Sequence, residues 1–600
     1  MKNKFKKTVA LAAVCAAVLG SAVNFPVDRS FNANAVSDVK GSNIGIITPD
    51  PILPGDYSNT ICFLENGNDD CTVGEYDNMI YLKYSDHIDI VDCTEDAVNL
   101  NIPEKIENLP VTKIGRNAFI GNSKIKSVSM PSTIEIVGNG SFCGCSALET
   151  VTMKNGSKNV IIEDWAFKNA RAIKSVTLAD NVVYIGSCAF NTCVSISSIN
   201  MPKNLKTIDS HAFTRCNSIT NIAVPEGVTE IWGHAFSGCA KLESLSLPST
   251  LERVPEYLVN ECESIKTVKL AEGIKEIDRW AFAYSSIENI EIPKSVTYLG
   301  DHAFQGCDKL KSAKIYGSVK SAGFQAFFGC SELETVILPD TVQAIEDYSF
   351  AYCYKLTNVT LPKNVTYIGR DAFRDCRALT SVSIPAGADT ISHQAFANCE
   401  NLKAVYVPEG VKEIGSVAFY GCDDLTYVSL PSSLERIGAQ AFEGCYNLNT
   451  IIIPENVKTI GARAFSYCDK LDSVVMFGKT TTFGKGMFTS SPNFYGVKGS
   501  DAEKYAGENE YKFEEITPFV SGDPSGDNVA DASDASMLLY EYALNSTGED
   551  GKFNVSQNFA GDVNTDGSVD ASDASKVLSF YAYTATGGKD PIGKFIACPE

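Results

Sequence analysis

Histidine and tryptophan are scarce in this chain, which has five and three of them among 600 residues. An active site built on a histidine cluster, or a sugar site lined with tryptophan, therefore has few residues to draw on. Basic residues are outnumbered as well, with 51 Lys and Arg against 73 Asp and Glu. The resulting net charge of −22 repels phosphate backbones and anionic headgroups, so nucleic acid is not an expected partner.

Long apolar runs are absent except near the N-terminus, where four lysines precede the run from Val9 to Val23. The small-residue pattern Ala33-Asn34-Ala35 follows, which predicts a secretory signal peptide over residues 1–35, with cleavage after Ala22 as the alternative. No other segment approaches the roughly 20 apolar residues that a bilayer crossing needs. We therefore expect a secreted, extracellular protein with no membrane span in the mature chain.

The sequence also lacks the common signatures of catalysis. It shows no nucleophile elbow, phosphate-binding loop, zinc motif or recognisable pair of catalytic carboxylates. Scattered acids on a repeat surface are usually there for solvation. We predict that the protein is not an enzyme.

An internal repeat dominates the middle of the chain. An apolar slot, filled by Phe except for Val259, recurs 17 times from Phe119 to Phe488 with a period of 23 residues. Each unit contains a short alternating run of the form Leu-x-x-Val-x-Leu-Pro and a second run of the form Val-x-x-Ile-Gly, both typical of strands with one buried face. A period of this length predicts a mostly β solenoid of about 17 coils, in which each unit buries its apolar face against its neighbours.

This pattern resembles the BspA-like leucine-rich repeats of bacterial surface and secreted proteins over residues 99–516. The resemblance implies capped ends. Residues 36–98, with strand candidates at Tyr81–Tyr84 and Ile88–Val91, are expected to form the N-terminal cap. Ser500 and Glu503 have the spacing of a helix-capping box, which predicts a short helix over the C-terminal end.

Cysteine is plentiful, and 13 of the 20 residues occupy one slot, three positions after the Phe slot. Side chains in one column point the same way into the core and are poorly aimed at each other, so we favour buried free thiols over a disulfide ladder. The other cysteines that bear on pairing are Cys62, Cys71, Cys93, Cys143, Cys188 and Cys598. Cys62 with Cys71 is the disulfide that we favour among them, although spacing alone assigns no pairing.

The surface of the repeat offers two candidate sites. The outward positions of the longer strand are small and polar apart from a late group, which is either ordinary surface or a protein-binding patch: Ile337, Tyr406, Tyr427, Ile452 and Val475. A second column lies two residues before the Phe slot and is either a set of side chains leaning over a turn, which we favour, or a ligand strip: Trp165, His211, His234, Tyr257, Trp280, His302 and Tyr348. A metal at the histidines lacks supporting carboxylates in matching slots.

Residues 522–600 carry a duplicated acidic motif, separated from the repeat by the short linker 517–521. Each copy has oxygen-bearing groups at the spacing of a calcium loop, and helices are expected after both loops, over 535–543 and 574–582. The predicted ligands of two Ca²⁺ ions are Asp523, Ser525, Asp527, Val529, Asp531 and Asp534 in the first loop, and Asp562, Asn564, Asp566, Ser568, Asp570 and Asp573 in the second. The first loop is less regular, because Asn528 stands where Gly is usual, although Asn tolerates a left-handed backbone.

The paired loops, each followed by one helix, resemble a type I-like dockerin of gut or rumen clostridia, a small all-α domain. The resemblance implies calcium-dependent docking to a cohesin on a scaffoldin, within a cellulosome-like complex that degrades plant polysaccharides. The family's cohesin contacts map onto Ala532, Ser533, Leu539, Ala571, Ser572, Leu578 and Ser579. A calcium-stabilised cap without a partner is the alternative.

Together these features predict a secreted, non-catalytic binding protein, with a solenoid that recognises a protein or cell-wall partner and a dockerin that attaches it to a scaffold. The alternatives are a polysaccharide-binding or carbohydrate-active subunit and a free adhesin. Because the linker is short, we expect the dockerin to stay close to the C-terminal cap of the solenoid.

Overall fold

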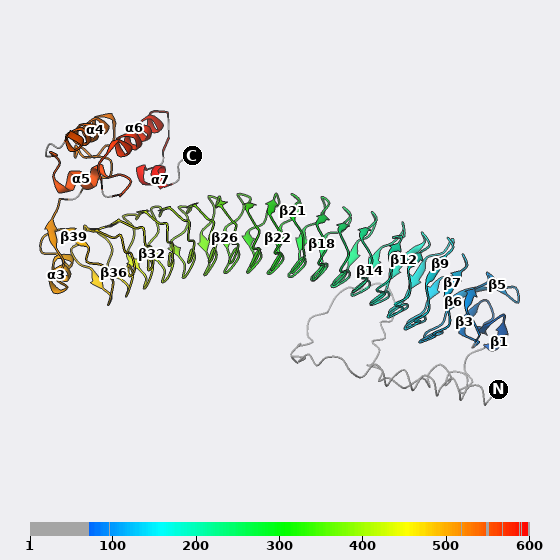
Figure 1. The fold of residues 1–600 in the computed structure, drawn as a ribbon. Coiled ribbons are helices and arrows are strands. Elements are labelled where there is room, and N and C mark those ends of the chain that lie inside the picture. The colour runs from blue at the N-terminus through cyan, green and yellow to red at the C-terminus, as the bar shows by residue number, and fades with distance from the viewer. Residues whose placement is uncertain are drawn as a thin grey trace, which may run out of the picture.

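A computed structural model describes residues 71–94, 96–517, 519–547, 551–566, 568–586, 588–589 and 591–597. The predicted signal peptide and the first part of the predicted N-terminal cap lie outside these residues, as do Cys62 and Cys598 and therefore the pairing expected for Cys62. The described part of the chain is an elongated parallel β-solenoid that carries a small helical module at its C-terminal end (Figure 1).

The solenoid has two strand faces, and the longer strands form the first of them. Among the described residues this long face has 19 rungs, two more than the 17 Phe-slot coils, because β4 precedes the first slot and β40 follows the last. At about 4.8 Å per rung it extends on the order of 90 Å. Its strands are β4 (Asn99–Asn101), β7 (Ser127–Met130), β9 (Thr150–Met153), β11 (Ser175–Thr177), β13 (Ser198–Ile199), β15 (Asn221–Ala223), β17 (Ser244–Ser246), β19 (Thr267–Lys269), β21 (Asn289–Ile292), β23 (Ser312–Ile315), β25 (Thr335–Ile337), β27 (Asn358–Val359), β29 (Ser381–Ser383), β31 (Ala404–Tyr406), β33 (Tyr427–Ser429), β35 (Thr450–Ile453), β37 (Ser473–Met476), β39 (Asn493–Gly496) and β40 (Phe513–Glu515).

The second face is made of the Val-x-x-Ile-Gly runs, and neighbouring strands on it pair in parallel, as they do on the long face. Its strands are β6 (Leu109–Ile114), β8 (Ile136–Val137), β10 (Val160–Ile162), β12 (Val182–Ile185), β14 (Thr207–Ile208), β16 (Glu230–Ile231), β18 (Arg253–Val254), β20 (Glu276–Ile277), β22 (Tyr298–Leu299), β24 (Ser321–Ala322), β26 (Ala344–Ile345), β28 (Tyr367–Ile368), β30 (Thr390–Ile391), β32 (Glu413–Ile414), β34 (Arg436–Ile437), β36 (Thr459–Ile460) and β38 (Thr482–Phe483).

The Phe slot forms a column of buried side chains between the two faces. Phe350, Phe373 and Phe396 are fully buried, and rings of adjacent coils stack with centroids 5.3 Å apart. The column runs from Phe119 to Phe488 and is interrupted where Val259 replaces Phe. A buried aromatic ring removes a large apolar area from water and stacks in an offset geometry, so this one slot ties each coil to the next.

The cysteine column lies beside the Phe column, and its thiols are buried and free, which confirms the expectation from the sequence. Each of the 13 thiols donates a hydrogen bond to the carbonyl oxygen of the Phe-slot residue one coil earlier. The Sγ to O distance is 3.0 Å from Cys145 to Phe119 and 3.2 Å from Cys376 to Phe350. A sulfhydryl is a weak donor, and here it satisfies a buried carbonyl while filling a small apolar space.

Additional strands and a helix lie at the two ends of the solenoid. At the N-terminal end β1 (Thr72–Tyr76), β2 (Met79–Lys83) and β3 (Ile88–Cys93) form an antiparallel meander that joins β6, and β5 (Lys105–Ile106) forms a hairpin with β6. At the other end helix α3 (Asp501–Glu508) begins at Ser500, whose side chain accepts a hydrogen bond from the Glu503 N–H group. These caps cover the open ends of the apolar core.

The C-terminal module consists of helices α4 (Ala532–Thr547), α5 (Val555–Gly561), α6 (Ala571–Ala585) and α7 (Ile592–Ala597). The predicted helices over 535–543 and 574–582 are confirmed and are longer than expected, while α5 and α7 were not predicted. Helix α4 packs on α6 through a small core that contains Leu538, Val563 and Val577. Among the described residues, no helix is both long and apolar enough to cross a bilayer.

Candidate functional site

The first acidic loop folds around the Asp523 carboxylate. Its Oδ1 atom accepts hydrogen bonds from the Ser525 hydroxyl at 2.8 Å and from the Gly526 N–H group at 2.6 Å. Burial would raise the pKa of Asp523, but these bonds, with others from the N–H groups of Asn528 and Asp527, hold it below its usual value. Asn528 adopts the left-handed conformation expected at this position, with φ of 70°.

The second loop repeats this arrangement. The Asp566 N–H group donates to Asp562 Oδ1 at 3.1 Å and to Asn564 Oδ1 at 3.0 Å, and the Ser568 N–H group donates to Asp566 Oδ1 at 3.0 Å. These contacts fold the second loop through the same kind of N–H to side-chain oxygen bonds as the first. The two copies of the acidic motif therefore fold with similar backbone hydrogen bonds.

The closing aspartates, Asp534 and Asp573, are fully buried. Each receives N–H bonds from loop positions 3 and 9, which are Asn564 and Asp570 in the second loop, at 3.3 and 3.0 Å. Burial raises the pKa of Asp573 to about 6, and the negative charges of Asp566 and Asp570 add to the effect. Burial likewise raises the pKa of Asp534. A nearby cation would favour the charged form of both groups.

Three carboxylates of the first loop gather closely enough to hold one ion. Ligand oxygens of Asp523, Asp527 and Asp534 all lie within 4.8 Å of one another. An all-oxygen donor set from carboxylates, a hydroxyl and a main-chain carbonyl fits a hard cation such as Ca²⁺. The first loop thus fits the ion that the sequence predicts, and the second loop carries the same kinds of oxygen donors.

The helices beyond the loops expose apolar side chains. Leu539 on α4 and Leu578 on α6, which are 39 residues apart and therefore equivalent in the duplication, are 47% and 48% exposed. Ser533, Ala571, Ser572 and Ser579 are exposed as well, and Ala532 is half-buried.

Two further exposed residues, Tyr542 and Tyr581, are also 39 residues apart and lie one turn beyond the exposed leucines on their helices. Neither tyrosine was predicted from the sequence as part of a binding surface. Their equivalence in the duplication was the available signal.

The fold and these paired loops define the class of protein: a leucine-rich repeat solenoid joined to a calcium-loop module. The BspA type leucine rich repeat region matches residues 112–241, 160–287, 275–403 and 368–495. The chain belongs to this family. Residues 521–579 match the dockerin type I domain, so the chain also carries a dockerin. Dockerin type I domains are calcium-binding modules, and their presence implies a cohesin partner.

The chain is similar to solved structures of bacterial leucine-rich repeat proteins. A leucine-rich repeat protein from Bacteroides ovatus is 24% identical, with 75% of this chain and 99% of that chain covered and a TM-score of 0.45. A leucine rich cell surface protein from Faecalibacterium prausnitzii is 23% identical, with 71% and 97% covered and a TM-score of 0.34. A search of curated proteins found no match.

The candidate ligand strip is a ladder of rings that stack on one another. Centroids lie 4.5 Å apart between His211 and His234, 4.5 Å between His234 and Tyr257, 6.0 Å between Tyr257 and Trp280, and 4.1 Å between Trp280 and His302. The backbone explains this position, because residues of the column have φ between 53° and 63° from Trp165 to Arg463 and project from a left-handed turn. Stacking on a sugar needs a free ring face, and the inner faces of this ladder are already occupied.

The ends of the strip differ from its middle. Trp165 is exposed, with the Lys168 ammonium 5.1 Å from its ring centroid. Tyr348 lies edge-on to Phe324 at 6.2 Å. The geometry supports the reading favoured from the sequence, in which the column consists of side chains leaning over a turn.

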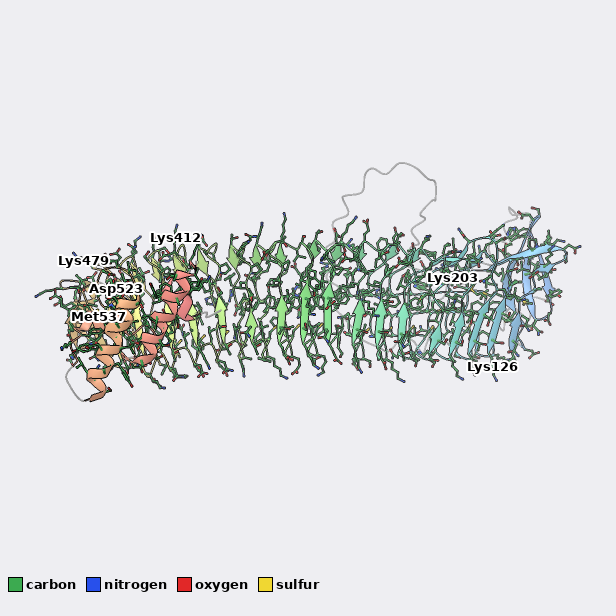
Figure 2. All side chains as sticks on the ribbon, turned by 90° about the horizontal axis from the view of Figure 1, so that it is seen from above. Lys126, Lys203, Lys412, Lys479, Asp523 and Met537 are labelled. Atoms are coloured by element: carbon green, nitrogen blue, oxygen red, sulfur yellow. The ribbon has the colours of Figure 1, made fainter. Side chains whose placement is uncertain are left out.

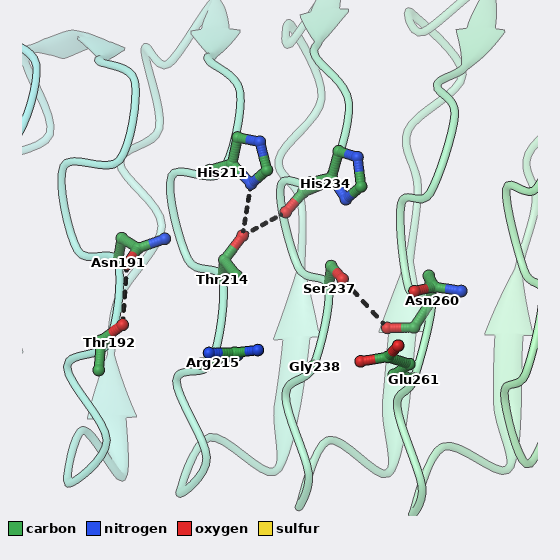
Figure 3. Close-up of a pocket in the computed structure, with 10 residues that line it drawn as sticks. All are labelled: Asn191, Thr192, His211, Thr214, Arg215, His234, Ser237, Gly238, Asn260 and Glu261. Carbon is green, nitrogen blue, oxygen red and sulfur yellow. Dashed lines mark hydrogen bonds between the residues drawn. The ribbon is translucent and has the colours of Figure 1, made fainter. Parts of the chain in front are cut away.

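A shallow pocket lies beside the two stacked histidines (Figure 3). The Thr214 hydroxyl donates to the His234 carbonyl oxygen at 2.7 Å, so it accepts from His211 Nδ1, 3.3 Å away. This pair of bonds places the proton of a neutral His211 on Nδ1. Burial lowers the pKa of both histidines, which keeps them uncharged at neutral pH.

The late apolar group on the long face does not form one exposed patch. The interpretation of this group as a protein-binding patch is therefore wrong. Val475 is fully buried and Tyr427 is 7% exposed, while Tyr406 and Ile452 are half-buried. Only Ile337, of this group, is largely exposed, at 50%. The physical reason is that the C-terminal module lies over the last coils, and contacts between modules are not visible in a repeat pattern.

Proposed function

We propose that this protein is a secreted, non-catalytic binding protein that is attached to a scaffoldin by calcium-dependent binding of its dockerin to a cohesin. The observation that carries the proposal is the duplicated module, with two oxygen-lined loops that close on buried aspartates and with exposed leucines at equivalent positions on α4 and α6. Two Ca²⁺ ions would be held, one by each loop. Calcium would neutralise the buried acids and so hold α4 and α6 in place.

The cohesin would bind the face of α4 and α6 that includes Leu539, Leu578 and the adjoining serines. Exposed apolar residues set among small polar ones suit the centre of a protein interface better than a solvated helix surface. Tyr542 and Tyr581 extend this face, and tyrosines often anchor protein interfaces.

The solenoid would bind a protein or cell-wall partner through the part of the long face that the dockerin leaves free. This face is flat, with small polar outward residues such as Ser244, Ser246 and Ser381, and it continues over many rungs. Solenoids of this kind present extended surfaces that contact a large ligand at many points. Because the inner ring faces of the aromatic ladder are occupied, we favour a protein over a polysaccharide as the ligand.

The test is binding of the full mature chain to a panel of recombinant cohesin modules, with calcium and with a chelator. We expect one or more cohesins to bind in calcium only. Changing both Leu539→Arg and Leu578→Arg should weaken that binding by about 100-fold or more, because charges at the centre of an interface are left without partners.

Ile337→Arg is the matched control, since it places the same charge at an exposed apolar position of the solenoid and should leave cohesin binding unchanged. Absence of binding to every cohesin, or binding that a chelator does not affect, would contradict the proposal. Retention of the chain on insoluble plant polysaccharides, lost in Trp280→Ala, would point instead to the polysaccharide-binding alternative.

A further inference from the structure

We propose that the last coils of the solenoid form a docking surface for the chain's own dockerin. This contact holds the dockerin in one orientation, with α4 and α6 directed away from the solenoid. The docking surface consists of the long face over β31, β33, β35, β37 and β39. Figure 1 shows α5 and α7 on the solenoid side of the module and α4 and α6 on the far side. In the view from above, the module lies across the C-terminal coils (Figure 2). This inference does not depend on cohesin binding.

Burial along the long face identifies the covered coils. Val475 and Ile337 occupy the same outward slot six repeats apart, yet Val475 is fully buried whereas Ile337 is 50% exposed. In the neighbouring outward slot Thr450 is 2% exposed, and its equivalent Thr335, five repeats earlier, is exposed. The repeat itself does not bury these slots, so a covering element must do so.

The linker and helix α5 make the first part of the contact. The Thr517 N–H group donates to Ser556 Oγ at 3.1 Å, which ties the linker to α5. The Phe519 ring lies edge-on to Phe477 of the solenoid, with centroids 5.3 Å apart, and stacks with Phe559 of α5 at 6.0 Å. Phe559 in turn lies edge-on to Tyr495 on β39 at 4.7 Å. Four aromatic rings from three segments thus form one apolar cluster at the junction.

The second calcium loop makes a separate contact. Thr565 is 7% exposed, and its hydroxyl donates to the carbonyl oxygen of Thr426, 3.4 Å away at the start of β33. Thr565 has φ of 55°, which is unfavourable for a β-branched residue. The equivalent residue of the first loop is Gly526, which is exposed and has φ of 80°. The loop that touches the solenoid therefore carries a side chain where the free loop has none.

Helix α7 completes the contact by bridging the two modules. Ile592 and Ile596 pack against the core of the dockerin, and the helix contacts β31 and β33. A Cβ atom at Gly593 would lie 2.5 Å from Ser429 Oγ and 3.3 Å from Tyr427 Oη. Glycine is unfavourable inside a helix, and here its missing side chain allows the helix to lie directly on the sheet.

The experiment is small-angle X-ray scattering of the full mature chain in calcium, with Val475→Asp as the test variant and Ile337→Asp as its control in the same slot. We expect the wild type and Ile337→Asp to give the same maximum dimension, consistent with a docked module. Val475→Asp should release the dockerin and increase the maximum dimension. It should also speed proteolytic cleavage between residues 517 and 521 by about tenfold or more, because that segment loses its contacts.

Gly593→Gln provides a second variant, since it lies outside the solenoid core and acts only through the close approach of α7. It should release the module in the same way. Far-UV circular dichroism must match the wild type in each variant. A wild-type chain whose dockerin already samples many positions in calcium, or variants that leave scattering and cleavage unchanged, would overturn the proposal. Cohesin binding should persist in both variants, so failure here is distinguishable from failure of the proposed function.

Discussion

At the scale of the residue, the solenoid depends on two columns, one of Phe and one of Cys, that recur along most of its coils. The Phe ring of one coil stacks on the ring of the next, and the Cys thiol donates to the Phe-slot carbonyl of the previous coil. Both contacts link neighbouring coils rather than distant ones. The stability of the solenoid is therefore a sum of local interfaces, and damage to one slot is felt first by its two neighbours.

Removing one ring from the Phe column should be costly. Phe373→Ala leaves a cavity between Phe350 and Phe396, and we expect a loss of about 3–4 kcal/mol in unfolding free energy. Phe373→Leu should cost less than half as much, because most of the volume is kept. Urea denaturation followed by circular dichroism would measure both. A loss below about 1 kcal/mol for the alanine variant would contradict a stabilising role for the stack.

The thiols of the cysteine column should be inert in the folded protein. Burial raises the pKa of Cys330, Cys353 and Cys376 well above the usual value for a thiol, so the reactive thiolate stays absent as the pH rises from 7 to 9. Alkylation followed by mass spectrometry should find all 13 residues unmodified in the native chain and modified in urea. Rapid native labelling in this column would indicate that the coils open.

At the scale of the element, calcium is expected to decide whether α4 and α6 are stable. The acids of each loop repel one another without a cation, and the fully buried Asp534 and Asp573 bear the largest cost. A chelator should therefore reduce helical circular dichroism in the full chain while the solenoid signal is retained. Helical content unchanged by the chelator would contradict this expectation.

Each loop should bind one ion independently. Asp534→Asn and Asp573→Asn remove the closing carboxylate of one loop each, and either change should reduce the calcium stoichiometry of the full chain from two to one. Isothermal titration calorimetry measures this directly. Glu508→Gln on α3, outside the module, is the control and should leave the stoichiometry at two. A wild-type stoichiometry of one would show that a single loop is functional.

At the scale of the whole molecule, the docking of the dockerin should be linked to calcium. The second loop places Thr565 against Thr426 only while the loop is ordered, so chelation should release the module. We expect the maximum dimension from scattering to increase when the chelator is added, and to be restored by excess calcium. An equal increase in ionic strength with NaCl is the control. Identical curves with and without calcium would exclude this linkage.

A docked dockerin would also orient the solenoid on its scaffold. With α4 and α6 directed outward, a bound cohesin would lie on the far side of the module from the long face. The free part of that face, from β4 to about β29, would then extend from the attachment point as a rigid arm.

The sequence alone determined the solenoid and the dockerin, because each depends on contacts between residues close in the chain or one period apart. The Phe350 ring stacks on the Phe373 ring, and the Asn564 N–H group donates to Asp573. Both contacts occur at spacings that are visible in the sequence. Tertiary structure alone decided which outward residues are covered. It also decided that rings such as those of His234 and Trp280 stack on their neighbours. The reason is distance along the chain: Thr565 and Thr426 are 139 residues apart, and no local pattern predicts that they touch.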